Sequence, residues 1–193
     1  VWLHLHPSKV RRHATRMRFT WCMGGITFLM FLVTVVTGVY LMFYYRPVAQ
    51  YAYADMKYLE FDMPFGMFMR NMHRWAAHGM IIAVWLHMFR VFMTGSYKPP
   101  REFNWVVGVI LLVLTLLLSF TGYLLPWDQK GYWATRVATN LAAIVPVVGP
   151  SIQKVVVGGM DYGHHTLTRF FALHAGVLPA LLVAMLVPHI ALF

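Results

Sequence analysis

Long apolar runs separated by short polar segments dominate this chain. Three of the runs, 19–45, 103–125 and 170–193, contain no Asp, Glu, Lys or Arg. A fourth, 72–94, is apolar but carries histidines and arginines. Each run is long enough to cross a hydrocarbon core about 30 Å thick. The pattern predicts an all-α membrane protein whose four spanning helices form one bundle.

The run 72–94 places two histidines on one helix face. At about 100° per residue, the step from His73 to His87 turns about 1400° and returns within about 40° of the same face. It also rises about 21 Å, so one ring is expected near each membrane surface. His78 is rotated about 140° from His73, and we expect it to be structural.

The last run repeats this arrangement with His174 and His189. Their step turns about 1500°, about 60° from the same face, and Pro179 between them could absorb the extra residue by kinking the helix. A single histidine on an apolar face is usually just packed, but ionisable groups in a membrane are costly and usually functional. Two helices with histidines at matching depths could form two stacked bis-histidine haem sites, an arrangement that favours electron transfer.

Glycines recur at a matching spacing in the other two runs. Gly24 and Gly38 are 14 residues apart, and so are Gly108 and Gly122. Small residues let membrane helices pack closely in any case. The matched spacing would also leave room beside two flat macrocycles at the two depths.

Two arginines flank the histidine pair. Arg70 lies three residues before His73, and Arg90 lies three residues after His87, which is one helical turn toward the surface in both cases. A guanidinium there could hold a haem propionate bidentately. Snorkelling to the membrane interface is the alternative interpretation.

Composition and charge narrow the function classes. The chain has 193 residues, of which 60% are hydrophobic and 11% charged, and a net charge of +10. The basic residues are scattered at the ends of the runs, so we expect no nucleic-acid partner. Basic clusters before the first run and between the second and third place the N-terminus on the cytoplasmic or stromal (N) side. The two loops of mixed charge then face the opposite (P) side.

The first residues and the third connection each suggest a surface element. Residues 1–18 mix apolar, basic and histidine residues, which predicts a retained amphipathic segment on an anionic lipid surface, before a haem domain at 19–193. The connection after residue 125 opens with LPWDQKGYWATRV and is too long for a simple turn. We expect short helices and a functional loop there, with an aromatic interface belt as the alternative.

Seven strings together resemble the amino-terminal half of cytochrome b, the haem-bearing subunit of quinol:cytochrome c oxidoreductases. They are CMGGIT, TGVYLMFYYRP, MHRWAAH with LHMFR, YKPPREFNWVVGV, TGYLLPWDQKGYWA and LTRFFALH. The similarity is closest to the cytochrome b6 type, to which the 15-residue step from His174 to His189 also points.

The resemblance implies the cofactors and their residues. His73 and His174 would bind a P-side haem b, and His87 and His189 an N-side haem b. Cys22, the only cysteine, would attach a third, c-type haem through one thioether bond. The quinol-oxidation loop would include Tyr123, Pro126, Trp127, Asp128, Tyr132 and Trp133.

The resemblance also implies a function, a Q-cycle. Quinol would give one electron to a Rieske iron–sulfur protein and the other to the haem pair, which would reduce quinone on the N side. The terminal acceptor would be a c-type cytochrome or a plastocyanin-like protein. The PEWY motif of the family's carboxy-terminal half does not occur here. The quinol site would therefore be incomplete in this chain and need that half, as in a split complex with a subunit IV-like partner.

The setting implied is a homodimeric complex in a bacterial cytoplasmic membrane or thylakoid. Two alternatives remain at this point. A di-haem membrane anchor of a quinone-linked dehydrogenase or hydrogenase would not explain PWDQ or Cys22. A transporter with metal-binding histidines would not explain the paired glycines.

Overall fold

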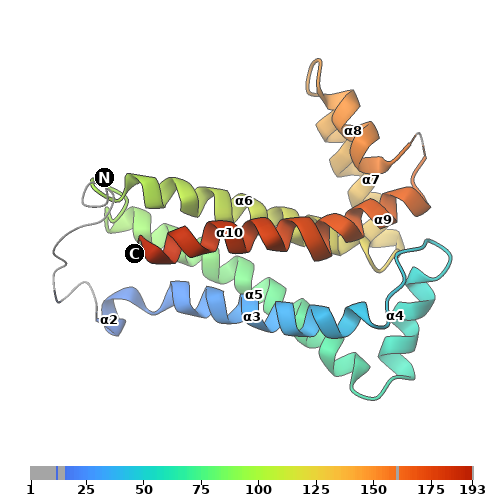
Figure 1. Ribbon diagram of the computed structural model, residues 1–193, viewed down its shortest axis with the longest axis horizontal. Coiled ribbons are helices and arrows are strands. Elements are labelled where there is room, and N and C mark those ends of the chain that lie inside the picture. Colours follow the sequence, from blue (N-terminus) through green and yellow to red (C-terminus); the bar gives the residue numbers. More distant parts are fainter. Residues whose placement is uncertain (1–11, 13–15, 160, 193) are drawn as a thin grey trace. The chain divides into compact units, whose positions relative to one another are not determined.

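The structure is a computed structural model that describes residues 12, 16–159 and 161–192 (Figure 1). Within these residues all regular structure is helical. The elements are α2 (Met17–Thr20), α3 (Met23–Met42), α4 (Ala52–Phe61), α5 (Gly66–Met93), α6 (Glu102–Leu124), α7 (Gln129–Ala143), α8 (Gly149–Val157), α9 (His164–Ala172), η1 (Leu173–Val177) and α10 (Leu178–Ala191).

Four helices in this part of the chain are long and apolar enough to cross a membrane. They are α3, α5, α6 and the continuous helix His164–Ala191, which comprises α9, η1 and α10. Helices α7 and α8 lie in the third connection. The predicted all-α fold class, with four spans and short helices in the third loop, is confirmed. The amphipathic segment 1–18 falls mostly outside the described residues, and its separation from 19–193 stays a prediction.

The chain divides into two compact units. The first unit comprises 1–36, 72–116 and 180–193, and the second comprises 37–71 and 117–179. Each unit therefore contains part of every spanning helix. His87 and His189 belong to the first unit, and His174 belongs to the second.

The first span begins later than the apolar pattern predicts. Trp21 and Cys22 have φ values of 54° and 49°, in the left-handed region that ends a helix. The backbone N–H of Trp21 donates to the carbonyl of Met17, and that of Cys22 to the hydroxyl of Thr20. Helix α3 therefore starts at Met23, directly after the cysteine.

The last span contains one wide turn. In η1 the backbone N–H of Leu178 donates to the carbonyl of Leu173, five residues earlier. A π turn holds one more residue than an α turn, and Pro179, which follows it, has no N–H to offer the carbonyl four residues back. The π turn thus takes up the extra residue between His174 and His189, where the sequence suggested a kink at Pro179.

The second unit has a compact apolar core. Tyr45, Ala52, Leu124, Leu167 and Phe170 are all buried and form one cluster. The cluster joins the segment after α3, the start of α4, the end of α6 and helix α9. It therefore fixes the loop that follows α6.

Candidate functional site

Two histidines of the first unit face each other. The rings of His87 on α5 and His189 on α10 have centroids 6.4 Å apart and planes at 82°. Both residues are half-buried. The structure therefore brings together one of the two histidine pairs that the sequence predicts.

Glycines border both rings of this pair. A Cβ atom at Gly24 of α3 would lie 3.4 Å from Cε1 of His87. A Cβ atom at Gly108 of α6 would lie 3.4 Å from Cε1 of His189. Any larger side chain would meet an imidazole, so these glycines keep the space beside the rings open.

The first unit fits a group that uses these imidazoles. Nδ1 of His189 is buried and forms no hydrogen bond of standard geometry among the described residues, although the backbone of Asn104 lies close enough to interact with the ring. Buried polar atoms are normally paired. Two imidazoles, a buried ring nitrogen without a standard hydrogen bond and flanking glycines together fit a flat macrocycle that carries a metal. We name this set, His87, His189, Gly24 and Gly108, the first-unit histidine site.

Cys22 and Arg90 belong to the same unit. Cys22 is a free, half-buried cysteine two residues from Gly24. A Cβ atom at Gly25 would lie 2.7 Å from its Sγ, so Gly25 makes room for the sulfur. Arg90 is half-buried in the last turn of α5, three residues from His87.

His174 of the second unit lies within the π turn and has a defined set of neighbours. Its Nδ1 is 3.0 Å from the carbonyl oxygen of Leu118 and 3.3 Å from Oγ1 of Thr121. A carbonyl can only accept, so Nδ1 carries the proton and Nε2 keeps a lone pair, as a metal-binding imidazole requires. A Cβ atom at Gly122 would lie only 2.6 Å from Cε1 of His174.

The other predicted residues on the spanning helices lie in both units and have different contacts. His73 is in the first unit and Gly38 in the second, and the pairing of His73 with His174 stays a prediction. Arg70 forms a 3.2 Å ion pair with Glu60, a partner that the sequence did not suggest. The exposed His78 places Nδ1 2.7 Å from the carbonyl of Arg74 within its own helix, in keeping with a structural role.

The predicted quinol-loop residues form a tight turn followed by α7. Trp127 has a φ of 52°, and its N–H donates to the carbonyl of Leu124. The carboxylate of Asp128 caps α7 by accepting from the N–H of Gly131 at 2.7 Å. Tyr132 contacts Trp127 edge to face, with ring centroids 5.7 Å apart.

The other members of the loop are less enclosed. Tyr123 and Trp133 are exposed, and Pro126 is half-buried. The indole N–H of Trp133 donates to the side-chain oxygen of Gln129 at 2.9 Å, which orients this ring along α7.

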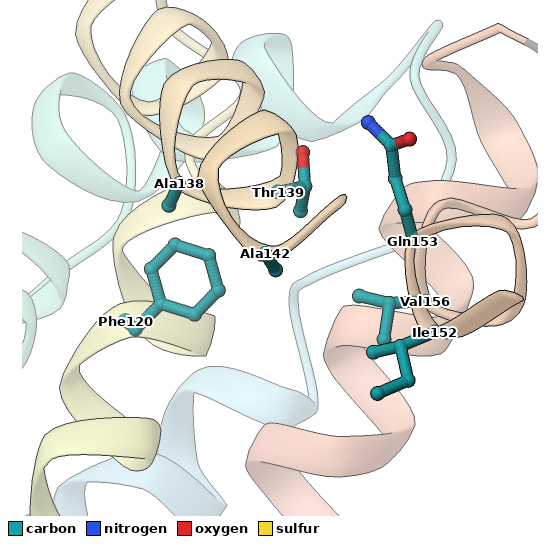
Figure 2. A pocket seen from close by; sticks show the side chains of 7 residues that line it. All are labelled: Phe120, Ala138, Thr139, Ala142, Ile152, Gln153 and Val156. Carbon is teal, nitrogen blue, oxygen red and sulfur yellow. The ribbon is translucent and has the colours of Figure 1, made fainter. Parts of the chain in front are cut away.

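A small apolar pocket lies between α6, α7 and α8 (Figure 2). It is lined by residues of α6, α7 and α8, namely Phe120, Ala138, Thr139, Ala142, Ile152, Gln153 and Val156. Figure 2 shows the Phe120 ring directed toward the two alanines of α7. At 170 Å³ the pocket is smaller than a typical ligand site of about 300–1,000 Å³. Alone it could hold only part of a quinol-sized ligand.

Several residues around this loop were missed from the sequence. The hydroxyl of Tyr45 donates to the carbonyl of Leu125 at 2.7 Å. Asp55, which is buried, accepts from the Nη2 of Arg46 at 2.6 Å and from the Nε and backbone N–H of the same residue. The only sequence signal was an isolated acidic residue nine positions after the arginine of FYYRP.

The pKa values of these groups follow from their contacts. Hydrogen bonds from the Arg46 guanidinium are the main reason that the pKa of Asp55 lies below its usual value. Burial, and secondly the Asp55 carboxylate, raise the pKa of the Tyr45 phenol. Tyr45 is therefore a neutral hydrogen-bond donor, and Asp55 is an anion.

Comparison with known proteins identifies the family. The family described as Cytochrome b/b6/petB matches residues 9–193. Cytochrome b6 of Tupiella akineta is 48% identical over 169 residues, which are 88% of this chain and 79% of that protein. Cytochrome b6 of Prochlorococcus marinus (strain MIT 9303) is 46% identical over 169 residues, with 88% and 78% covered.

A solved structure is also similar. A chain of "Hyperthermophilic respiratory Complex III" superposes with a TM-score of 0.83 at 30% sequence identity. The match covers 90% of this chain and 47% of the other, so this chain spans about half the length of that neighbour. The match over residues 9–193 and the similarity to most of the length of cytochrome b6 proteins lead to one conclusion: this chain belongs to the cytochrome b/b6 family.

Proposed function

We propose that this chain is the cytochrome b subunit of a quinol oxidoreductase complex and carries electrons across the membrane between two quinone sites. The observation that carries the proposal is the first-unit histidine site, in which His87 and His189 face each other and each ring borders a glycine. Membership of the cytochrome b/b6 family implies b-type haems and favours this function over a dehydrogenase anchor or a transporter.

His87 and His189 would hold one b-type haem and His73 and His174 the other. Each haem, when bound, supplies a one-electron redox centre, and two imidazole ligands leave it no open position for oxygen chemistry. The chain supplies imidazole rings, glycines that admit a flat group, and Leu118, whose carbonyl orients His174. Arg90, half-buried in the last turn of α5 and three residues from His87, would bind a haem propionate. Arg70 could do so near His73 only in competition with Glu60.

Quinol would be oxidised beside the loop from Tyr123 to Ala134. The chain would contribute the turn at Trp127, the cap by Asp128, and the pocket between α6, α7 and α8. A carboxylate from a carboxy-terminal half of cytochrome b would complete the site. The chain would therefore act as an enzyme only within a complex.

The partners follow from this role. They are a subunit IV-like carboxy-terminal half, a Rieske iron–sulfur protein, a c-type cytochrome and membrane lipid, in a homodimeric complex. The chain itself is a multi-pass protein with four candidate spans. We propose that its N-terminus lies on the cytoplasmic or stromal side. The reason is that basic residues cluster before the first span and between the second and third spans.

Cys22 would attach a third haem in the first unit. The thiol would add across one vinyl group, so that a carbon–sulfur bond forms and the thiol hydrogen passes to the other vinyl carbon, without any oxidant. A half-buried free thiol two residues from Gly24 supports this proposal. On a denaturing gel stained for haem peroxidase activity, the polypeptide should retain haem and Cys22→Ser should not. Complete loss of haem from the unaltered chain would reject the attachment.

The function itself is tested by isolating the chain with its bound partners from membranes. We expect two low-spin haems that quinol reduces, and a Rieske protein in the same complex. Co-purification with a dehydrogenase subunit would support the anchor instead, and a colourless protein would support the transporter.

A further inference from the structure

We propose that Tyr45 is a positioning residue for the quinol-oxidation loop, and that the Arg46–Asp55 ion pair braces it. This inference rests on the proposed function for its effect on quinol. Its structural part, the hold of Tyr45 on the loop, stands on contacts within the second unit.

The hydrogen bond from Tyr45 joins two distant segments. Tyr45 lies just after α3. Its hydroxyl donates at 2.7 Å to the carbonyl of Leu125, which is 80 residues later in the chain. Tyr45 is only 8% exposed, and its ring centroid lies 5.5 Å from that of Phe171. The ring is thus held by packing, and its hydroxyl has one direction in which to donate.

The acceptor, the carbonyl of Leu125, lies just before a strained residue of the loop. Leu125 comes directly after the end of α6 and directly before Pro126, which has no backbone N–H. The next residue, Trp127, has a φ of 52°, a conformation that costs a non-glycine residue energy and persists only where its surroundings fix it. A bond to the Leu125 carbonyl therefore acts two residues before the strained position.

The ion pair fixes the residue next to Tyr45. Asp55 of α4 has a side chain that is 7% exposed, and it accepts from the backbone N–H, the Nε and the Nη2 of Arg46. Because Arg46 follows Tyr45 directly, these bonds restrain the backbone that carries the phenol. The loop is consequently tied to α4 through two adjacent residues.

The test compares Tyr45→Phe with the unaltered chain in the intact, purified complex. The change removes one hydroxyl and keeps the buried ring. Amide hydrogen exchange in the segment 124–131 should speed up by about fivefold, the effect of one lost hydrogen bond. The KM for quinol should rise by about threefold, with a smaller change in kcat.

Tyr40→Phe is the matched control. Tyr40 lies near the same end of α3, but its hydroxyl reaches the carbonyl of Pro64 at 3.3 Å and not the loop. Exchange in 124–131 and the KM for quinol should both stay at the unaltered values in this variant. Equal changes in the two variants would mean that the loss of any phenol near this surface has the same effect, which overturns the specific role.

The outcomes separate this inference from the proposed function. If the unaltered complex does not oxidise quinol, the proposed function fails, while the exchange measurement still decides whether Tyr45 holds the loop. If Tyr45→Phe assembles and its exchange stays within about twofold of the unaltered complex, the inference is wrong. If Tyr45→Phe does not assemble, Asp55→Asn decides: faster exchange in 124–131 supports the brace, and unchanged exchange overturns it.

Discussion

His189 in the first unit and His174 in the second are contrasting histidines of the same continuous helix. His174 lies in a π turn, has its Nδ1 next to Leu118 and Thr121, and leaves almost no space at Gly122. His189 lies in an α-helical turn, and its Nδ1 forms no hydrogen bond of standard geometry among the described residues, with only the backbone of Asn104 nearby. A Cβ atom at Gly108 would lie at ordinary contact distance from its ring.

The difference shows that equal spacing in the sequence does not mean equal support in the fold. Contacts with Leu118 and Thr121 orient the ring of His174 without any bound group. Binding of a haem would therefore not need to reorient this ring. The ring of His189 would gain order from the bound group. Loss of haem should therefore disturb the first unit more than the second.

The largest expected effect comes from removing a ligand. His87→Leu and His189→Leu should each abolish the same haem, with a loss of about half of the b-type absorbance, because a bis-histidine site needs both rings. A reduced-minus-oxidised spectrum measures this. His78→Leu, on the same helix as His87 but exposed, should keep both haems. Loss of different haems in the two ligand variants would break the pairing.

The second prediction compares the glycines. Gly122→Ala would place Cβ 2.6 Å from the oriented ring of His174 and should destabilise the protein by about 1–3 kcal/mol. Gly108→Ala would place it 3.4 Å from His189, and the cost should be below about 1 kcal/mol. Haem retention during a denaturant titration measures both. Equal sensitivity at the two positions would remove the contrast between the units.

The third prediction uses acid. The pKa of Asp55 is lowered in the folded chain, so its ion pair contributes stability above the unfolded pKa of about 3.9 and loses it as pH falls through the lowered value. At pH 7, Asp55→Asn should lower the thermal stability of the second unit. That deficit should shrink below about pH 4. A deficit that is independent of pH would show that the carboxylate charge has no part in the stability.

The smallest effect is expected at Thr121. Thr121→Val keeps the shape of the side chain but removes the hydroxyl 3.3 Å from Nδ1 of His174, while the Leu118 carbonyl remains. Stability should change by less than about 1 kcal/mol. The electron paramagnetic resonance spectrum of the haem that we propose His174 binds should shift, and that of the other haem should not. A shift in both, or in neither, would contradict a local role.

The sequence was most informative where one helix repeats a simple period. The spans follow from the length of the apolar runs, and the histidine faces follow from 100° per residue. The glycine spacing matches that of the histidines, and a Cβ atom at Gly24 or Gly108 would contact His87 or His189, respectively. The early break at Trp21 and Cys22 was not predictable, because both residues suit an apolar helix and only their φ values reveal the end of it.

Contacts between distant segments were also out of reach. From the sequence, Tyr45 is indistinguishable from other aromatic residues at a membrane interface. No nearby sequence motif indicates its hydrogen bond to Leu125. In the sequence, Asp55 and Glu60 look like ordinary acidic residues of a connection. Only the folded structure shows that Asp55 pairs with Arg46 and Glu60 with Arg70. These pairings depend on how the connections return to the helix ends, which hydrophobic periodicity does not encode.

The π turn also determines which length changes this chain could tolerate. A single deletion within 173–177, after His174, could convert the wide turn into an α turn and shorten the helix by one step without a large rotation of the residues after it. A single deletion between Pro179 and His189 has no spare residue to remove and would swing His189 by about 100° away from His87. Tolerated single deletions in this helix should therefore be confined to one turn, which makes η1 the place where the span can shorten while His189 keeps its face.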